Sequence, residues 1–303
     1  MDSIDKGILL DLTKNCRSTY ESLAQKFDLS ATAVRQRVIN LIDVGVIQEF
    51  TVYLTPAMVG TEHIYALLST DGSRSDDLID EIGEYPNVLL AGFLSTDTCS
   101  VYADYVGNSD LSKLTAFLRN LEGVTDVKVH HLLVNPGHRM EFKRLHLRVL
   151  GCLYRDPRMS AADIAAQTGL TTRRARRALQ QLAEGNAICF TIRWNPNATD
   201  STAFMSEIHF DESKVNAYDT LDNIKEMYPQ EFCEDYSWIS AAEPIVFAVF
   251  LVDHIRRAEH ITHDLRASSF ITSINTLIPY PTKKYDGVRR RRLREILEEA
   301  GVL

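Results

Sequence analysis

The stretch Leu23-Ala24-Gln25-Lys26-Phe27-Asp28-Leu29-Ser30 returns 141 residues later as Ile164-Ala165-Ala166-Gln167-Thr168-Gly169-Leu170-Thr171, with apolar and small residues at matching positions. The correspondence continues into the following segment, where Arg35 matches Arg176. An internal repeat of this kind indicates a duplicated supersecondary unit. The sequence therefore predicts two copies of one fold within a single chain.

Each copy has the residues that a helix-turn-helix requires. An alanine stands where the second and third helices cross, and the turn position that follows holds Asp28 or Gly169. Glycine, and at modest cost aspartate, adopts the left-handed backbone of such a turn. Ser30 and Thr171 then occupy the N-cap position of the third helix, where a hydroxyl accepts a hydrogen bond from an unpaired backbone N–H.

The third helix of each copy leaves polar side chains on the side away from its apolar residues. Val34, Val38 and Leu41 are expected to face inward in the first copy, and Ala175, Leu179 and Leu182 in the second. The outward positions are Thr32, Arg35, Gln36, Ile39 and Asn40 in the first copy, and Arg173, Arg174, Arg176, Arg177 and Gln180 in the second. Arginine pairs with phosphate and guanine, and Asn or Gln with adenine, so this surface predicts DNA binding. The alternatives are a solvated helix face or a protein-contact module.

A second kind of segment follows each helical copy, with the order strand, helix, strand, strand, helix, strand. In the first half the strands are expected near 63–70, 88–94, 99–106 and 124–134, and the helices near 75–84 and 111–120. In the second half the strands are expected near 203–210, 231–239, 245–252 and 272–279, and the helices near 215–227 and 255–267. This βαββαβ order is that of a ferredoxin-like domain.

The predicted fold class is therefore α+β, with two winged helix-turn-helix modules alternating with two ferredoxin-like domains. Proline-containing turns place the boundaries. The expected divisions are 1–60 and 137–198 for the helix-turn-helix domains, 61–136 and 199–282 for the ferredoxin-like domains, and 283–303 for a basic C-terminal helix.

Residues 4–60 resemble the DNA-binding domain of the leucine-responsive regulatory protein/AsnC (Lrp/AsnC) family of prokaryotic regulators. The segments that carry the resemblance are Ile4-Asp5-Lys6, Asn15-Cys16-Arg17, Val34-Arg35 with Arg37-Val38, and Gly45-Val46-Ile47. The resemblance implies a transcription regulator that binds double-stranded DNA, self-associates through its ferredoxin-like sheets and responds to an amino acid or related metabolite. By position, it implies DNA contacts from Thr32, Arg35, Gln36, Arg37 and Asn40.

The expected effector site departs from the pattern of the family. Where that family carries a glycine-and-aspartate turn between the two middle strands, this chain has Leu94-Ser95-Thr96-Asp97-Thr98-Cys99. Ser95, Thr96 and Asp97 offer polar groups for an amino acid, and an ordinary polar hairpin turn explains the same residues.

The end of the chain is first basic and then acidic. Lys283, Lys284, the run Arg289–Arg292 and Arg294 precede Glu295, Glu298 and Glu299. Two interpretations stand side by side: added contacts to DNA phosphates, or a surface helix with ion pairs such as Arg291 with Glu295 and Arg294 with Glu298.

The composition limits the possible functions. The chain has 303 residues, 45% of them hydrophobic, and a formal net charge of −8. It is therefore a packed protein, and any nucleic-acid binding depends on a local basic surface. Five scattered cysteines without a C-x-x-C pair predict reduced thiols in a cytoplasmic protein. We expect no membrane span, metal site or cofactor.

An enzyme is the alternative to a regulator, because duplicated chains of this architecture also occur as sirohaem decarboxylases. That reaction requires a tetrapyrrole cavity, cations for the carboxylates and a proton donor. His130 and His131 are adjacent on a predicted strand and point to opposite faces, which disfavours a shared site. The sequence also lacks H-E-x-x-H, G-x-S-x-G and G-x-G-x-x-G. We therefore expect a regulator and not an enzyme.

Overall fold

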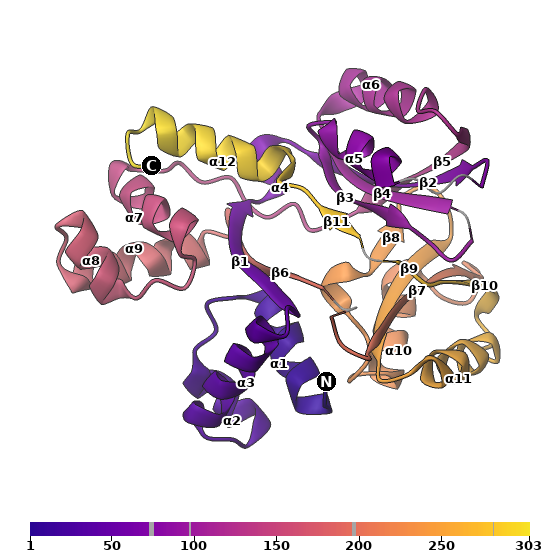
Figure 1. Cartoon of the computed structure of the whole chain (residues 1–303), viewed down its shortest axis with the longest axis horizontal. Helices are drawn as coiled ribbons and strands as arrows, with labels where there is room; N and C mark the ends of the chain where they lie inside the picture. Colours follow the sequence, from indigo (N-terminus) through magenta and orange to yellow (C-terminus); the bar gives the residue numbers. More distant parts are fainter. Residues whose placement is uncertain (73–75, 97, 196–197, 281) are drawn as a thin grey trace.

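The computed structural model describes residues 1–72, 76–96, 98–195, 198–280 and 282–303. Each half begins with three helices and a strand (Figure 1), which are α1 (Ser3–Lys14), α2 (Tyr20–Phe27), α3 (Ala31–Asp43) and β1 (Ile47–Leu54), then α7 (Arg144–Arg155), α8 (Ala161–Thr168), α9 (Thr172–Glu184) and β6 (Ile188–Trp194). Both predicted winged helix-turn-helix modules are present. Within these described residues, no helix has the length and apolar character needed to cross a bilayer.

Two ferredoxin-like units follow these modules. The first contains β2 (Glu62–Thr70), α5 (Asp76–Glu84), β3 (Val88–Phe93), β4 (Thr98–Tyr105), α6 (Gly107–Arg119) and β5 (Val124–Leu133), after a short helix α4 (Pro56–Val59). The second contains β7 (Thr202–Phe210), α10 (Ala217–Met227), β8 (Trp238–Ser240), β9 (Ile245–Val252), α11 (Ile255–Arg266) and β10 (Ile271–Leu277). The α+β fold class and the βαββαβ order are confirmed.

The predicted strand near 231–239 is wrong in extent. Only Trp238–Ser240 forms β8, and the 3₁₀ helix Glu234–Tyr236 precedes it. The cause is local hydrogen bonding: the N–H of Tyr236 donates to the carbonyl of Cys233 at 3.1 Å, which closes a turn. The Ser237 hydroxyl then accepts from the N–H of Val249 on β9 at 3.0 Å, so a side chain replaces the backbone ladder there.

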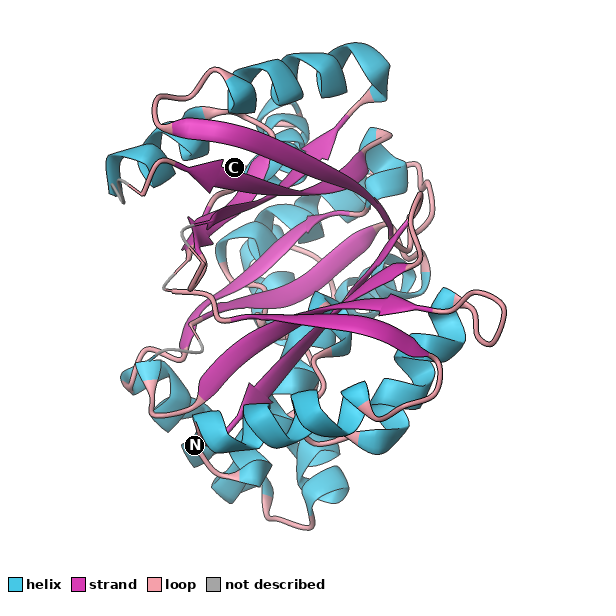
Figure 2. Ribbon diagram, turned by 90° about the vertical axis from the view of Figure 1, so that its right-hand side faces the viewer, coloured by secondary structure: helices cyan, strands magenta, loops and turns pink. Residues whose placement is uncertain are grey.

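The two ferredoxin-like units share one nine-stranded sheet with the strand order β10-β7-β9-β8-β5-β2-β4-β3-β11. β5 and β8 join the units through the pairs Leu132 with Ser240 and Leu133 with Ile239. A bridge between Leu94 and Pro279 also connects the far edges. The two four-stranded halves therefore face one another, with helices outside them (Figure 2).

The facing sheets enclose an apolar layer that includes Tyr65, Leu132, Met205 and Phe247. The rings of Tyr65 and Phe247 lie 5.0 Å apart, edge to face. Separate cores lie between each sheet and its own helices. The two units thus associate within one chain, and association between separate chains stays a prediction.

The C-terminal segment differs from the helix expected over 283–303. Lys283–Lys284 form the short strand β11 against β3, and helix α12 begins only at Gly287 and ends at Glu299. Leu293 and Leu297 of α12 are fully buried against the helical modules. A strand forms at Lys283 because the edge of β3 offers unpaired backbone groups there.

Candidate nucleic-acid interface and junction cavity

Both turns have the geometry that the sequence predicts. Asp28 has φ 51° and ψ 50°, and Gly169 has φ 62° and ψ 24°, so both are left-handed. The Ser30 hydroxyl accepts from the N–H of Ala33 at 3.1 Å, and the Thr171 hydroxyl accepts from the N–H of Arg174 at 3.3 Å. Each recognition helix, α3 or α9, therefore begins at a capped and exposed N-terminus.

On α3 the structure divides the predicted DNA-contacting residues into two groups. Thr32, Arg35, Gln36 and Asn40 are exposed. Arg37 is only 29% exposed, and its guanidinium lies 2.7 Å from carboxylate oxygens of both Asp2 and Asp5. These hydrogen bonds raise the pKa of Arg37. Its charge is thus shared with the N-terminal helix, and it holds α3 against α1.

On α9 all the predicted residues are exposed: Arg173, Arg174, Arg176, Arg177 and Gln180. Among the residues that the structure describes, none of the four arginines has a carboxylate within ion-pair distance. The buried face of α9 differs from the prediction that Leu179 faces inward, because Ala178 is fully buried and Leu179 only partly. The small Ala178 allows α9 to lie close to the rest of its module.

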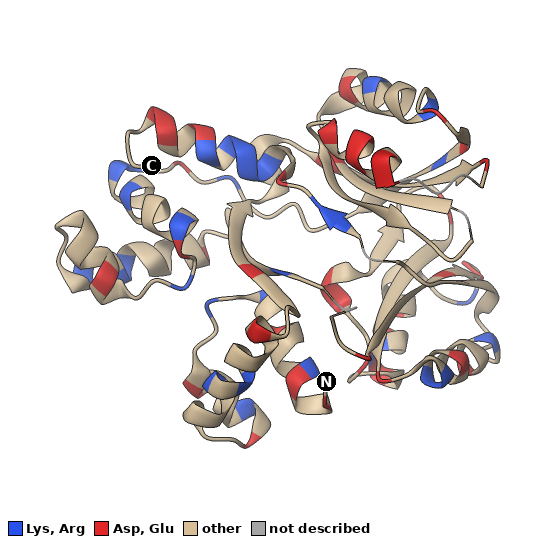
Figure 3. Cartoon of the chain, viewed as in Figure 1, with Lys and Arg blue, Asp and Glu red and all other residues tan. Residues whose placement is uncertain are grey.

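The arginines of α12 contrast with those of α9. Arg289 pairs with Asp104 at 3.0 Å, Arg290 with Glu49 at 2.7 Å, and Arg294 with Glu298 at 2.7 Å. The predicted pair of Arg291 with Glu295 is wrong: Glu295 accepts from Arg292 at 2.9 Å, and Arg291 donates to backbone carbonyls. Figure 3 shows the acidic residues that follow the basic ones on this helix. The predicted surface ion pairs are therefore confirmed in part, and carboxylates neutralise much of the positive charge of α12.

Each helix-turn-helix module contacts the other through an arginine at the equivalent position. Arg17 donates to the carbonyls of Pro157 and Met159, the latter at 3.1 Å. Arg158, which lies 141 positions later, donates to the carbonyls of Cys16 and Ser18, the latter at 3.2 Å. A contact in which each copy presents the same groups to the other is the signature of a two-fold arrangement. The recognition helices are thus related by an approximate two-fold axis.

The wings of the modules also pair with each other. β1 and β6 form a two-stranded antiparallel sheet in which Thr51 faces Thr191 and Tyr53 faces Cys189. Directly paired residues lie on the same face. This polar face of the wing pair turns toward the ferredoxin-like units, while the other face packs into the helical modules.

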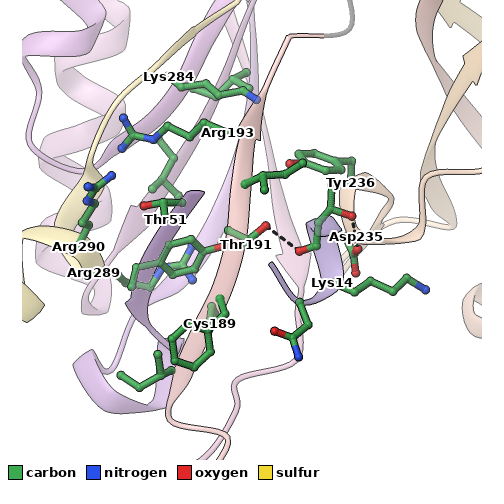
Figure 4. Close-up of a pocket in the computed structure, with 18 of the residues that line it drawn as sticks. Lys14, Thr51, Cys189, Thr191, Arg193, Asp235, Tyr236, Lys284, Arg289 and Arg290 are labelled. Atoms are coloured by element: carbon green, nitrogen blue, oxygen red, sulfur yellow. Dashed lines mark hydrogen bonds between the residues drawn. The ribbon is translucent and has the colours of Figure 1, made fainter. Parts of the chain in front are cut away.

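A cavity of about 560 Å³ lies at this junction, between the wing pair, the ferredoxin-like units and the start of α12 (Figure 4). A neighbouring cavity of about 400 Å³ shares several of its walls: Tyr53, Tyr102, Asn135, Cys189, Asp235, Trp238 and Arg289. We call the two together the junction cavity. Its total size falls in the range of ordinary metabolite sites.

A buried charged network forms one wall of the junction cavity. Asp104 is fully buried; its carboxylate lies 2.6 Å from Nδ1 of His63 and accepts from Nε of Arg289 at 3.0 Å. Burial opposes the charge of Arg289, but Asp104 outweighs it and raises the pKa of the guanidinium. The hydroxyl of Tyr102 lies 3.2 Å from Nδ1 of His63.

Lys284 stands apart from these paired groups. Its Nζ donates to the backbone carbonyl of Trp194 and lies 5.7 Å from the Trp194 ring. Burial, with a smaller contribution from the nearby charge of Arg193, lowers the pKa of Lys284 to about 7. An amine in this setting is partly uncharged at neutral pH.

The predicted effector residues lie elsewhere, at the far edge of the first sheet. Ser95 donates its N–H to the carbonyl of Ile278 at 3.0 Å, and its hydroxyl accepts from the N–H of Ile278 at 3.4 Å. Thr96 bonds to Thr98 at 3.2 Å. Asp97 lies outside the described residues. In the described part of this turn, Ser95 links the two ferredoxin-like units, and effector binding there stays a prediction.

The sequence reasoning missed the junction cavity and its charged wall. The partners Asp104 and Arg289 are 185 positions apart, and no local motif joins them. The one available signal is the basic tail, for which the sequence predicts either contacts to DNA phosphates or a surface helix with ion pairs. Trp194 lies in β6 and Trp238 in β8, and Trp238 also lines the cavity.

Comparison with known proteins gives the family. Residues 1–48 and 142–188 match the winged helix-turn-helix DNA-binding family. The regulator PH0140 of Pyrococcus horikoshii is 28% identical over 120 residues, which cover 39% of this chain and 74% of that protein. The transcriptional regulator LrpA of Bacillus subtilis is 39% identical over 69 residues, covering 23% of this chain and 50% of that protein.

A solved structure matches the whole chain. The siroheme decarboxylase NirDL, in complex with an iron-uroporphyrin III analogue, superposes with a TM-score of 0.53 over 99% of both chains, at 12% identity. At that identity the match shows a common fold. The chain is therefore a duplicated protein of the Lrp/AsnC type, with a winged helix-turn-helix region in each half.

Proposed function

We propose that this protein is a sequence-specific DNA-binding transcription regulator that places α3 and α9 on two half-sites of one duplex. The observation that carries the proposal is the row of four exposed arginines on α9, none of which has a carboxylate partner in the part of the chain that the structure describes. In a chain with a net charge of −8, such a local excess of positive charge is where DNA phosphates would bind.

The arrangement of the two modules supports the same proposal. The reciprocal contacts of Arg17 and Arg158, together with the wing pair, hold α3 and α9 about an approximate two-fold axis. Two-fold regulators bind half-sites whose spacing mirrors their own symmetry. Because α3 and α9 carry different side chains, the two half-sites would differ in sequence.

Selection from genomic DNA tests the proposal. Purified protein is incubated with pooled genomic fragments from its source, and fragments retained at rising salt are sequenced. The expected result is enrichment of a defined fragment by the native protein and its loss in the double variant Arg173→Ala, Arg176→Ala. The matched control is Arg292→Ala, Arg294→Ala, which removes two arginines that are already paired with glutamates on α12.

Retention by the α9 variant equal to that of the native protein would contradict the proposal, and so would retention without enrichment of any fragment. Equal loss in the α12 control would mean that overall charge, rather than α9, governs binding.

A second candidate function is decarboxylation of a tetrapyrrole. The observation that favours it is the full-length fold match to NirDL together with a junction cavity that contains arginines, a lysine and a histidine. The test is titration with sirohaem while the Soret band is followed. A saturable shift, followed by release of carbon dioxide, would support the enzyme; an unchanged band at excess sirohaem would exclude it.

A further inference from the structure

One basic side chain of the junction cavity has no carboxylate partner among the described residues. Its other lysines and arginines are paired: Lys14 and Lys225 with Glu234, Arg289 with Asp104, and Arg193 and Arg290 with Glu49 and Asp286. In the described part of the chain, Lys284 has no such partner; its amine donates to a backbone carbonyl and lies against Trp194 and Tyr236. A buried amine in this position favours an anion brought from outside.

The wing pair offers a further polar group. Thr51 on β1 is 3% exposed, and its hydroxyl has no hydrogen-bond partner among the described residues although Thr51 lines the cavity. A buried hydroxyl without a partner destabilises the protein unless a ligand or water satisfies it. Figure 4 shows Thr51 on the wall of the cavity between Arg193 and Arg289.

The rest of the wall is aromatic and flat. Tyr102 stacks on Trp238 with the ring centroids 4.9 Å apart and the planes 7° from parallel. Tyr53 and Tyr236 add two more rings to the lining. His63 stacks on Tyr102 as well, with the ring centroids 5.6 Å apart, so these rings already pack on one another. Together they form an apolar wall against which the carbon part of a ligand can be buried.

We propose that the junction cavity binds an organic anion of metabolite size, with its anionic group against Lys284 and Arg193 and its carbon part against the aromatic wall that contains Trp238. This site is distinct from the turn at Ser95 and Thr96, which lies at the far edge of the first sheet. It is formed by both halves of the chain, so neither half alone would contain it.

The position of the site also suggests what binding does, and this step rests on the proposed function. Three residues separate the end of α3 at Asp43 from the start of β1 at Ile47. Three residues likewise separate α9 from β6. The wing pair that follows both recognition helices is itself a wall of the cavity. A ligand that orders or shifts the wing pair therefore changes the relative placement of α3 and α9.

Pyridoxal 5′-phosphate is a suitable probe, because it combines a planar ring, a phosphate and an aldehyde. The deprotonated amine of Lys284 attacks the aldehyde carbon, and the carbonyl oxygen leaves as water to give an imine. Borohydride then adds hydride to the imine carbon, and water supplies a proton to the nitrogen, which leaves a stable secondary amine. Peptide mapping by mass spectrometry locates the modified lysine.

The expected result is labelling at Lys284 at least ten-fold above Lys283 at low probe concentration. Lys283 is the matched control, since it is adjacent in the chain but exposed and paired with Asp80 at 2.6 Å. Lys283→Met is expected to leave the labelling unchanged, and Lys284→Met to abolish it. Of the two tryptophans of the chain, Trp238 lines the cavity and the ring of Trp194 lies 5.7 Å from the Lys284 amine, so quenching of tryptophan fluorescence measures binding without the covalent step.

Labelling spread over surface lysines, or quenching unchanged in Arg193→Met, would overturn the site. A separate measurement tests the coupling to DNA: the affinity for the selected DNA fragment is measured by fluorescence anisotropy with and without the bound probe. An unchanged DNA affinity with specific labelling would reject the coupling and keep the site. Specific labelling in a protein that selects no DNA would reject the proposed function and keep the site.

Discussion

The reciprocal arginines provide a sharp prediction about how the two halves are held together. Arg158→Met removes a guanidinium that bonds to two carbonyls of the first module and lies 4.8 Å from the Tyr20 ring and 5.3 Å from the Phe50 ring. Arg17→Met removes the equivalent group, which bonds to two carbonyls of the second module. Methionine keeps the apolar length of the side chain, so the change isolates the guanidinium.

The magnitude follows from these contacts. A hydrogen bond from a charged donor contributes about 1.5–3 kcal/mol, and a cation–π contact at a partly exposed site about 0.5–1 kcal/mol. Arg158 is half-buried, and solvent screens part of these energies. Arg158→Met should therefore lower the free energy of unfolding by about 2–4 kcal/mol, and Arg17→Met by a similar amount.

Urea unfolding of the native protein, both single variants and the double variant measures this. We expect losses that are less than additive in the double variant, because either substitution already loosens the shared interface. Arg155→Met is the control, since Arg155 is exposed and donates to the carbonyl of Val302 at 3.2 Å within the same half. A loss below about 0.5 kcal/mol in both single variants would refute the two-fold interface as a source of stability.

Three further predictions concern the junction cavity and the buried thiols. Arg289→Met leaves the fully buried Asp104 without its cation, so the free energy of unfolding measured with urea should fall by about 3–5 kcal/mol. Adding Asp104→Asn to this variant should restore part of the lost stability. An unchanged free energy of unfolding in Arg289→Met would contradict the buried ion pair. Because burial lowers the pKa of Lys284 to about 7, the unfolded chain binds more protons than the folded one from there up to the ordinary lysine range, so native stability should gain up to about 1.4 kcal/mol per pH unit from this residue in that window. Lys284→Met should remove that rise, and an identical pH dependence in the variant would refute it. Burial raises the pKa of Cys16 and Cys99 to about 12, so both thiols should react with a disulfide reagent at least a hundred-fold more slowly in the folded protein than in urea, and equal rates would contradict their burial.

Features that depend on neighbouring residues could be predicted from the sequence. The turn at Asp28 or Gly169 and the N-caps at Ser30 and Thr171 are local, since backbone sterics and one hydrogen bond determine them. The alternation of apolar and polar residues within each strand is also local, and it helped to predict the βαββαβ order.

Features that depend on pairing between distant segments could not be predicted. The wing pair joins residues such as Thr51 and Thr191, which are 140 positions apart, and only the register of the folded sheet brings them together. Arg37 matches a DNA-contacting position by spacing, but its pairing with Asp2 and Asp5 depends on how α1 packs on α3. The basic run in α12 has the composition of a phosphate-binding helix, and its burial against Asp104 and Glu49 gives it a structural role.

The most direct test of the central claim is the salt dependence of binding to the selected fragment. The logarithm of the association constant is measured against the logarithm of salt concentration for the native protein, Arg173→Ala with Arg176→Ala, and the α12 control. Each phosphate contact contributes about 0.9 to this slope, so the α9 variant should lose about 1.8 and the control nothing. A slope equal in all three proteins would contradict the claim that α9 binds DNA.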